Sequence, residues 1–171
     1  MKIPCPHCSK LNQLAIERLA SQPICGACKK DLLSAPLEVD EQLFEELTAQ
    51  SPLPVIADFW ASWCAPCKAS FPMLAKLDRE LGARGFQVVA IGIDEKPTAA
   101  EAFVKKLNPG FPTLHDHGQK LVRRVDVPTM PTSFLLGRDG KVRFIHRGFH
   151  GDRTESELRR QIAELLAETN H

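Results

Sequence analysis

The cysteines are the residues best suited to chemistry in this sequence, because thiolates bind soft metals and exchange disulfide bonds. All six fall into three C-x-x-C pairs, which are Cys5/Cys8, Cys25/Cys28 and Cys64/Cys67. Only residues 9–24 separate the first two pairs, whereas the third pair lies in a very different local context. We therefore divide the cysteines into an N-terminal group of four and a separate pair.

The four N-terminal cysteines predict a structural zinc site. Two C-x-x-C turns at this spacing direct four thiolates toward one point, which is the ligand set of a closed tetrahedral site. A closed site leaves no open position for catalysis, so we expect about one zinc ion per chain with a role in folding. His7 is expected to face solvent rather than to bind the metal. Disulfides or free thiols are the alternative, and disulfides would need an oxidising compartment.

Cys64 and Cys67 predict dithiol–disulfide exchange. They follow a short apolar run suited to a buried strand (residues 55–60) and begin a segment whose apolar residues have helical spacing. Cys64 then stands at a helix N-terminus, where free N–H groups and the helix dipole stabilise a thiolate by up to about 2 kcal/mol. Cys67, one turn further on, is less accessible and can attack a mixed disulfide formed on Cys64. Half of a metal site is the alternative, but no second pair lies near it.

The elements that position these residues follow an α/β pattern. Residues 1–34 have few large apolar residues and form the predicted zinc module, and residues 35–171 form the predicted second domain. In that domain the apolar patterns predict helices at 40–49, 65–81, 98–107, 119–125 and 155–168, and strands at 55–60, 86–93, 133–136 and 141–146. Asp139-Gly140 predicts a hairpin turn between the last two strands. The order predicts parallel central strands, an antiparallel edge and helices on both faces.

Composition and charge exclude several classes of protein. Hydrophobic residues make up 43% of the chain, and 22 basic against 21 acidic residues give a net charge of +1. This balance argues against nucleic acid or an anionic membrane as the main partner. No apolar run approaches the roughly 18 residues that cross a bilayer, and no apolar segment of a signal peptide follows Met1-Lys2. We therefore expect a cytoplasmic location.

The segment from Trp60 to Cys67 resembles the active site of the thioredoxin superfamily, and the resemblance covers about residues 37–168. It implies a thioredoxin fold, in which a mixed sheet is flanked by helices, beside a small zinc-ribbon-like module. Thr129-Met130-Pro131-Thr132 resembles the cis-proline loop, so Met130 and Pro131 would bind an extended substrate segment by strand addition. Trp63 is expected at the rim of the site.

Asp58 matches the buried aspartate of thioredoxins. A carboxylate within an apolar strand is expensive to bury, which itself favours a functional role. The resemblance implies that Asp58 accepts the proton of Cys67 through water. The position of the lysine that neighbours this aspartate in thioredoxins is Ala90 here, so Asp58 lacks that partner.

Two branches of the superfamily are represented in one chain. Residues 1–68 resemble the zinc-containing thioredoxins known as thioredoxin 2, and the part after Cys67 resembles TlpA-like thiol-disulfide reductases. Both natural divergence and an engineered chimera would give this combination. TlpA-like proteins often carry a glutamate where this chain has Ser70, and thioredoxins carry glycine where it has Ala65. TlpA-like proteins are usually exported, in contrast to the cytoplasmic location expected here.

Together these features predict a protein-disulfide reductase whose substrates are disulfide-containing proteins. The resemblance implies a flavin-dependent thioredoxin reductase, fed by NADPH, as the electron donor. Neither Ala65 nor Pro66 adds a hydrogen-bond donor for the Cys64 thiolate, so we expect a reductant rather than an oxidant. The alternatives are an extracytoplasmic oxidase, isomerase or cytochrome-maturation reductase, and a non-enzymatic zinc-stabilised binding module.

The remaining histidines show no metal-binding spacing among themselves; they are His115, His117, His146, His150 and His171. His115 and His117 alternate along a predicted loop, where solvation is expected.

Overall fold

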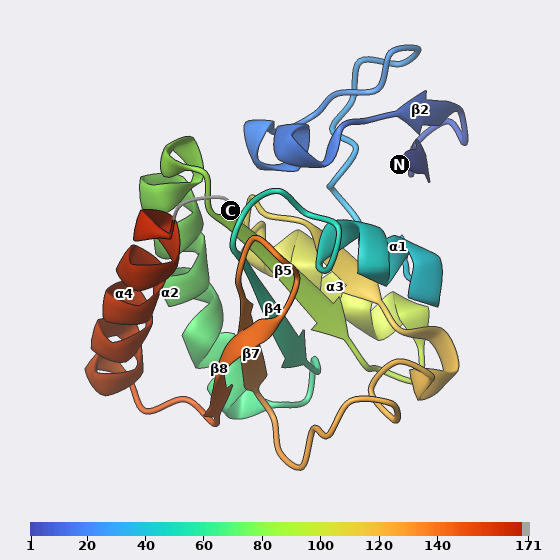
Figure 1. Ribbon diagram of the computed structural model, residues 1–171. Coiled ribbons are helices and arrows are strands. Elements are labelled where there is room, and N and C mark those ends of the chain that lie inside the picture. Colours follow the sequence, from blue (N-terminus) through green and yellow to red (C-terminus); the bar gives the residue numbers. More distant parts are fainter. Residues whose placement is uncertain (169–171) are drawn as a thin grey trace.

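The computed structural model describes residues 1–168 (Figure 1), apart from the side chains of Glu17 and Ala20. The last three residues of the predicted second domain, including His171, lie outside the described part. The elements in chain order are β1 (Lys2–Pro4), β2 (Leu11–Gln13), the 3₁₀ helix η1 (Ile16–Ser21), β3 (Leu37–Glu38), α1 (Glu41–Leu47), β4 (Val55–Trp60), α2 (Ala65–Leu81), η2 (Gly82–Arg84), β5 (Gln87–Gly92), α3 (Pro97–Leu107), β6 (Thr113–His115), η3 (His117–Gln119), β7 (Thr132–Leu136), β8 (Val142–Arg147) and α4 (Asp152–Ala167).

A six-stranded mixed sheet forms the centre of the molecule, with the order β3-β6-β5-β4-β7-β8. The strands β3, β6, β5 and β4 are parallel, and β7 and β8 are antiparallel to their neighbours. Every residue of β4 and β5 is buried, as expected for strands covered on both faces. The thioredoxin fold and its antiparallel edge are thus confirmed.

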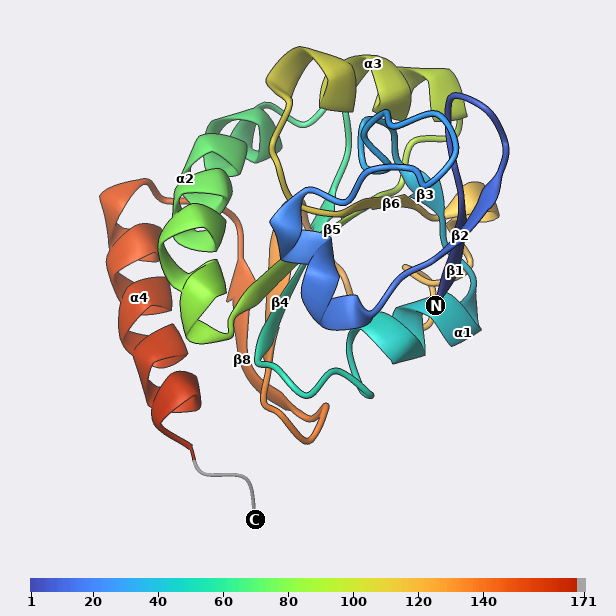
Figure 2. The ribbon, with the colours of Figure 1, turned by 90° about the horizontal axis from the view of Figure 1, so that it is seen from above.

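Helices cover both faces of this sheet. On one face α2 and α4 lie side by side, joined by the ion pairs Lys76–Glu155 (3.0 Å) and Arg159–Glu80 (2.8 Å). α1 lies on the opposite face, which is clearest in the view of Figure 2. Among the described residues, no helix has the length and apolar character that crossing a bilayer requires.

The packing of Trp60 against α2 in the core fixes the position of the cysteine pair. Trp60 is fully buried, stacks on Phe103 of α3 at 4.5 Å between ring centroids, and meets Phe71 of α2 edge-on at 5.3 Å. A Cβ at Gly92 of the neighbouring strand would lie 2.9 Å from the Trp60 ring, so the close approach of β5 requires glycine. The apolar face of α2 then fixes the helix under β4 and sets the position of its N-terminus.

One predicted helix is wrong. Gln119 is the last residue of η3, and residues 120–125 form turns, because the left-handed conformation of Gln119 (φ 56°) ends the helical run. The Asp116 carboxylate accepts hydrogen bonds from the backbone N–H groups of Leu121 (3.0 Å) and Val122 (2.9 Å) and holds the turn in place. The short strands β3 and β6, by contrast, were not predicted; two or three residues are too few for a recognisable alternation.

The N-terminal residues form a small unit around a two-stranded antiparallel sheet of β1 and β2. Ile3, Leu19, Leu32 and Leu33 are among its buried apolar side chains. The Met1 ammonium group lies 3.8 Å from the Glu46 carboxylate of α1, which connects the unit to the sheet domain. In Figure 1 this unit lies at the opposite end of the sheet from the N-terminus of α2.

Candidate active site and metal centre

Cys64 and Cys67 form a disulfide at the N-terminus of α2, with their Cα atoms 5.3 Å apart. Cys64 is the N-cap residue, and its Sγ accepts a hydrogen bond from the backbone N–H of Cys67 at 3.2 Å. The chain reaches this position by a tight turn after β4, in which the Cys64 N–H donates to the Ala61 carbonyl at 3.1 Å. The predicted placement of the pair is confirmed, and an N–H group is already directed at the first sulfur.

The two sulfurs differ in accessibility in the predicted order, although the difference is small. Cys64 retains 4% exposure and Cys67 none. Cys64 opens onto a shallow hollow of about 470 Å³, which Trp63, Ile93 and Met130 also line. Trp63 is 68% exposed, so it stands at the rim as expected. Cys64 is more covered than the sequence predicted, because these neighbours flank it.

The loop before β7 lies against the same hollow. The Met130–Pro131 peptide bond is cis, as the resemblance to the cis-proline loop implied. Met130 lines the hollow together with Thr129, whereas Pro131 is buried and does not line it. The structure therefore brings Cys64, Trp63 and Met130 together at one surface.

Asp58 is buried in the middle of β4, six residues before Cys64 in the chain. The strand register places it between Ala90 of β5 and Ser133 of β7, so the position beside it on β5 is indeed alanine. The Ser133 hydroxyl donates a hydrogen bond to Asp58 Oδ1 at 2.5 Å, and Oδ2 has no partner among the described residues. Burial raises the Asp58 pKa to about 7, and the Ser133 hydrogen bond lowers it only in part. The carboxyl group can therefore take up or release a proton near neutral pH.

Ser133 and Asp94 are site residues that sequence reasoning missed. Asp94 follows β5 and is buried; its carboxylate accepts from the Ser62 backbone N–H (3.0 Å) and from the Ser62 hydroxyl (2.6 Å). It thereby anchors the turn that leads to Cys64. A serine within the buried strand β7 and an aspartate just after the buried strand β5 were the available signals.

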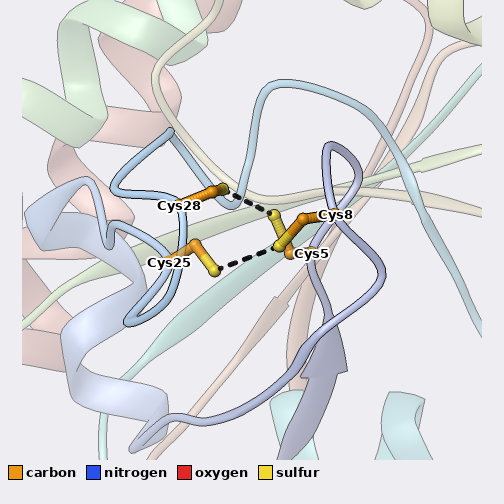
Figure 3. Close-up of side chains that lie close together, drawn as sticks. All are labelled: Cys5, Cys8, Cys25 and Cys28. Atoms are coloured by element: carbon orange, nitrogen blue, oxygen red, sulfur yellow. Dashed lines mark hydrogen bonds between the residues drawn. The ribbon is translucent and has the colours of Figure 1, made fainter.

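The four N-terminal cysteines converge on one point, as Figure 3 shows. The Cys5 and Cys28 sulfurs are 3.6 Å apart, and those of Cys8 and Cys25 are 3.7 Å apart. A tetrahedral zinc ion with Zn–S distances of about 2.3 Å would place its sulfurs about 3.8 Å apart, so the cluster fits zinc.

Backbone N–H groups support this metal centre, and His7 stays out of it. The N–H groups of His7 and Ala27 point at the sulfurs of Cys5 and Cys25, at 3.4 Å each. These hydrogen bonds stabilise the negative charge of the thiolates and hold the sulfurs in place. The exposed His7 ring is not part of the cluster and instead contacts the Ser34 hydroxyl at 2.9 Å.

The predicted solvation of His115 is wrong. His115 belongs to β6, an interior strand of the sheet with every residue buried, and is only 1% exposed. Both ring nitrogens have partners, which are the Glu38 carboxylate and the Asp94 carbonyl oxygen, each at 2.8 Å. His117 is exposed, as expected.

Comparison with known protein families divides the chain into two parts. The Redoxin family matches residues 38–162, and the zinc-ribbon family described as "Thioredoxin 2, N-terminal" matches residues 4–30. The first match contains the disulfide pair, and the second contains all four clustered cysteines.

Individual relatives agree with this division. The thiol-disulfide oxidoreductase ResA of Bacillus thuringiensis subsp. konkukian is 31% identical over 111 residues, which are 65% of this chain and 62% of that protein. Thioredoxin C-3 of Corynebacterium nephridii is 41% identical over 81 residues, which are 47% of this chain and 56% of that protein. The chain thus spans less than two thirds of the length of these relatives.

Solved structures show the same fold. A Chlorobium tepidum protein described as a thiol:disulfide interchange protein DsbE superposes with a TM-score of 0.66 and 38% identity, over 69% of this chain and 83% of that one. A secreted Mycobacterium tuberculosis disulfide oxidoreductase superposes with a TM-score of 0.59 and 25% identity, over 68% and 84% of the two chains.

Proposed function

Since the chain belongs to the Redoxin family, we propose that it is a thiol–disulfide oxidoreductase that reduces disulfide bonds in protein substrates. The observation that carries this proposal is the Cys64–Cys67 disulfide at a helix N-terminus, open to a hollow shared with Met130 of the cis-proline loop. An extended substrate segment would lie in this hollow against the Met130 backbone, with its sulfur next to Cys64.

The reaction proceeds in two exchange steps. The Cys64 thiolate attacks one sulfur of the substrate disulfide; the substrate S–S bond breaks, and one substrate thiolate leaves and takes up a proton. The Cys67 thiolate then attacks Cys64 Sγ, which releases the second substrate thiolate and forms the Cys64–Cys67 disulfide. Two electrons pass to the substrate, and the protein is oxidised by the same amount.

Asp58 serves the second step as a proton acceptor. Cys67 is fully buried, so its thiol must lose a proton inside the protein before it can attack. With a pKa of about 7, the Asp58 carboxyl group is partly ionised at neutral pH and can accept that proton, through water. We therefore assign Cys64 as the nucleophile, Cys67 as the resolving thiol and Asp58 as the base.

The return of electrons needs an external donor, for which we propose a thioredoxin reductase. We also propose a cytoplasmic site of action, because four thiolates held for a metal persist best where glutathione and thioredoxin keep thiols reduced. The reduction potential tests the direction: we expect a value nearer to about −270 mV, as in thioredoxin, than to about −120 mV, as in DsbA. A value near the latter would favour an extracytoplasmic oxidase instead.

In the N-terminal unit, Cys5, Cys8, Cys25 and Cys28 would hold one zinc ion. The ion supplies no chemistry to the disulfide exchange, because all four of its positions are filled by sulfur. The four cysteines fix the β1–β2 unit in the folded state, since Ile3, Leu19, Leu32 and Leu33 form only a very small core.

Insulin reduction with a matched pair of variants tests the assignment. Cys64→Ser should abolish the activity, whereas Cys67→Ser should accumulate a mixed disulfide with the substrate that is visible on a non-reducing gel. Full activity of Cys64→Ser would remove the proposal, and trapping by Cys64→Ser rather than by Cys67→Ser would reverse the two roles.

A further inference from the structure

Three metal-ligating side chains gather at the β3 edge of the sheet, apart from the cysteine cluster. The parallel register pairs Glu38 of β3 with His115 of β6, and the Glu38 Oε1 lies 2.8 Å from His115 Nδ1. His117 follows in η3, with its ring centroid 6.2 Å from that of His115. One ligand atom from each of the three residues lies within 4.8 Å of the others.

The second nitrogen of His115 fixes which ring atom can bind a metal. His115 Nε2 lies 2.8 Å from the Asp94 carbonyl oxygen, which can only accept, so Nε2 carries a hydrogen. The 2.8 Å contact with the Glu38 carboxylate is a hydrogen bond donated by Nδ1, so a metal ion would bind Nδ1 by replacing that hydrogen. Metal-binding histidines usually have this arrangement, in which the far N–H is bonded to a carbonyl or carboxylate and orients the ring.

The donor set and its spacing suit a borderline divalent cation. Two imidazole nitrogens and one carboxylate are the ligands of many zinc sites, with metal–ligand distances of about 2.0–2.2 Å. On a tetrahedral ion such ligand atoms lie about 3.4 Å apart. His115 Nδ1 and Glu38 Oε1, which are hydrogen-bonded at 2.8 Å, would therefore separate by about 0.6 Å around the ion. The His115 side chain is 1% exposed and that of Glu38 is 60% exposed. His115 is thus a buried ligand held in one position, and Glu38 is a ligand that a metal ion in solvent can reach.

We propose that Glu38, His115 and His117 form a second metal site, which binds Zn²⁺ or a similar divalent cation independently of the four cysteines. Three protein ligands leave a position for water on the solvent side. The bound ion would join β3 to β6, which the register otherwise holds by only two residue pairs. Through His115 the ion would also help to hold Asp94, because His115 contacts the Asp94 carbonyl oxygen. The Asp94 carboxylate in turn anchors Ser62 in the turn before Cys64.

A cobalt titration separates this site from the cysteine cluster. The zinc-loaded, disulfide-oxidised protein is passed over a chelating resin and then titrated with Co²⁺. Cobalt bound by nitrogen and oxygen gives weak visible bands without the strong near-ultraviolet absorption of cobalt–thiolate bonds. We expect about one equivalent of such cobalt per chain, displaced on addition of Zn²⁺.

Variants of the two exposed ligands complete the test. His117→Ala and Glu38→Gln should each lower cobalt affinity at least about tenfold, the lower end of what disrupted coordination shells usually cost. His150→Ala, which removes another exposed histidine, is the matched control and should bind as the parent does. Thermal unfolding monitored by circular dichroism verifies that all three are folded. Cobalt binding that is absent, shows thiolate absorption, or is equal in His117→Ala and His150→Ala would overturn the proposal.

Discussion

Replacing Asp58 by asparagine should make the protein more stable above neutral pH. The Asp58 side chain is buried between β5 and β7 with one oxygen bonded to Ser133, and the described residues give the other oxygen no partner. Because burial disfavours the charged form, the pKa rises from 3.8 to about 7 in the folded protein. The unfolded chain, where the carboxyl group is solvated, keeps the ordinary value.

The size and sign of the effect follow from these two pKa values. Between them the folded protein holds a proton that the unfolded chain has released, so the free energy of unfolding falls as pH rises. The values differ by about 3, and each unit is worth about 1.4 kcal/mol, so the loss approaches about 4 kcal/mol above pH 7. Below the unfolded pKa both states are protonated and the loss vanishes. Asparagine does not titrate, so the variant lacks this loss.

Urea denaturation of the disulfide-bonded forms between about pH 5 and pH 8 measures the difference. The buried amide of the variant lacks a partner for its hydrogens and destabilises by about 1–3 kcal/mol, but equally at every pH. The decisive quantity is therefore the slope: the stability of Asp58→Asn relative to the parent should rise between about pH 5 and pH 7 and then level off. Asp126→Asn, which changes a side chain that is 88% exposed, is the control for a general charge effect. A parent–variant difference that is flat across this range would refute the reasoning.

Three further changes test other parts of the structure. Ser133→Ala removes the hydrogen bond that lowers the Asp58 pKa, so the pH at which the mixed disulfide is resolved at half its maximal rate should move upward. Pre-steady-state kinetics at several pH values would measure this shift, and an unchanged pH profile would exclude Asp58 as the base. Gly140→Ala places a Cβ 2.4 Å from the Ala49 backbone at a φ of 70°, and we expect it to destabilise by about 1–3 kcal/mol more than Gly118→Ala, which has a φ of 71° and open space. Equal losses in the two glycine variants would mean that the collision is relieved. Removing zinc with a chelator under reducing conditions should abolish hydrogen-exchange protection in β1 and β2 and leave β4 and β5 protected; retained protection in β1 and β2 would show that the metal is dispensable.

Long elements with a clear pattern were predictable, and short ones at the margin of the sheet were not. β4 has the predicted limits, and α2 runs from the cysteine pair to Leu81, because a continuous apolar run and a helical stripe are local signals. β3 and β6 are held by pairing with neighbours rather than by their own pattern. The helix expected at residues 119–125 is absent because Gln119 adopts a left-handed conformation in the turn around Asp116. Apolar periodicity carries no information about such a turn.

In the candidate site, too, residues with a local signal were predictable and those selected by tertiary contacts were not. The cysteine pair, the proline loop and Asp58 could be found because each is unusual within its own segment. The partners Ser133, 75 positions from Asp58, and Asp94, 32 positions from Ser62, could not be assigned because strand register selects them.

The register of β7 and the burial of Asp58 depend on each other. Side chains alternate along a strand, so a slip of β7 by one residue would bring Thr132 or Phe134 opposite Asp58 in place of Ser133. A phenylalanine there would leave both carboxyl oxygens buried without a partner, and such a group is costly. Ser133 therefore also acts against mispairing, and Ser133→Ala, which removes the hydroxyl partner of Asp58 and leaves the other residues of β7 unchanged, is the variant that tests this contribution.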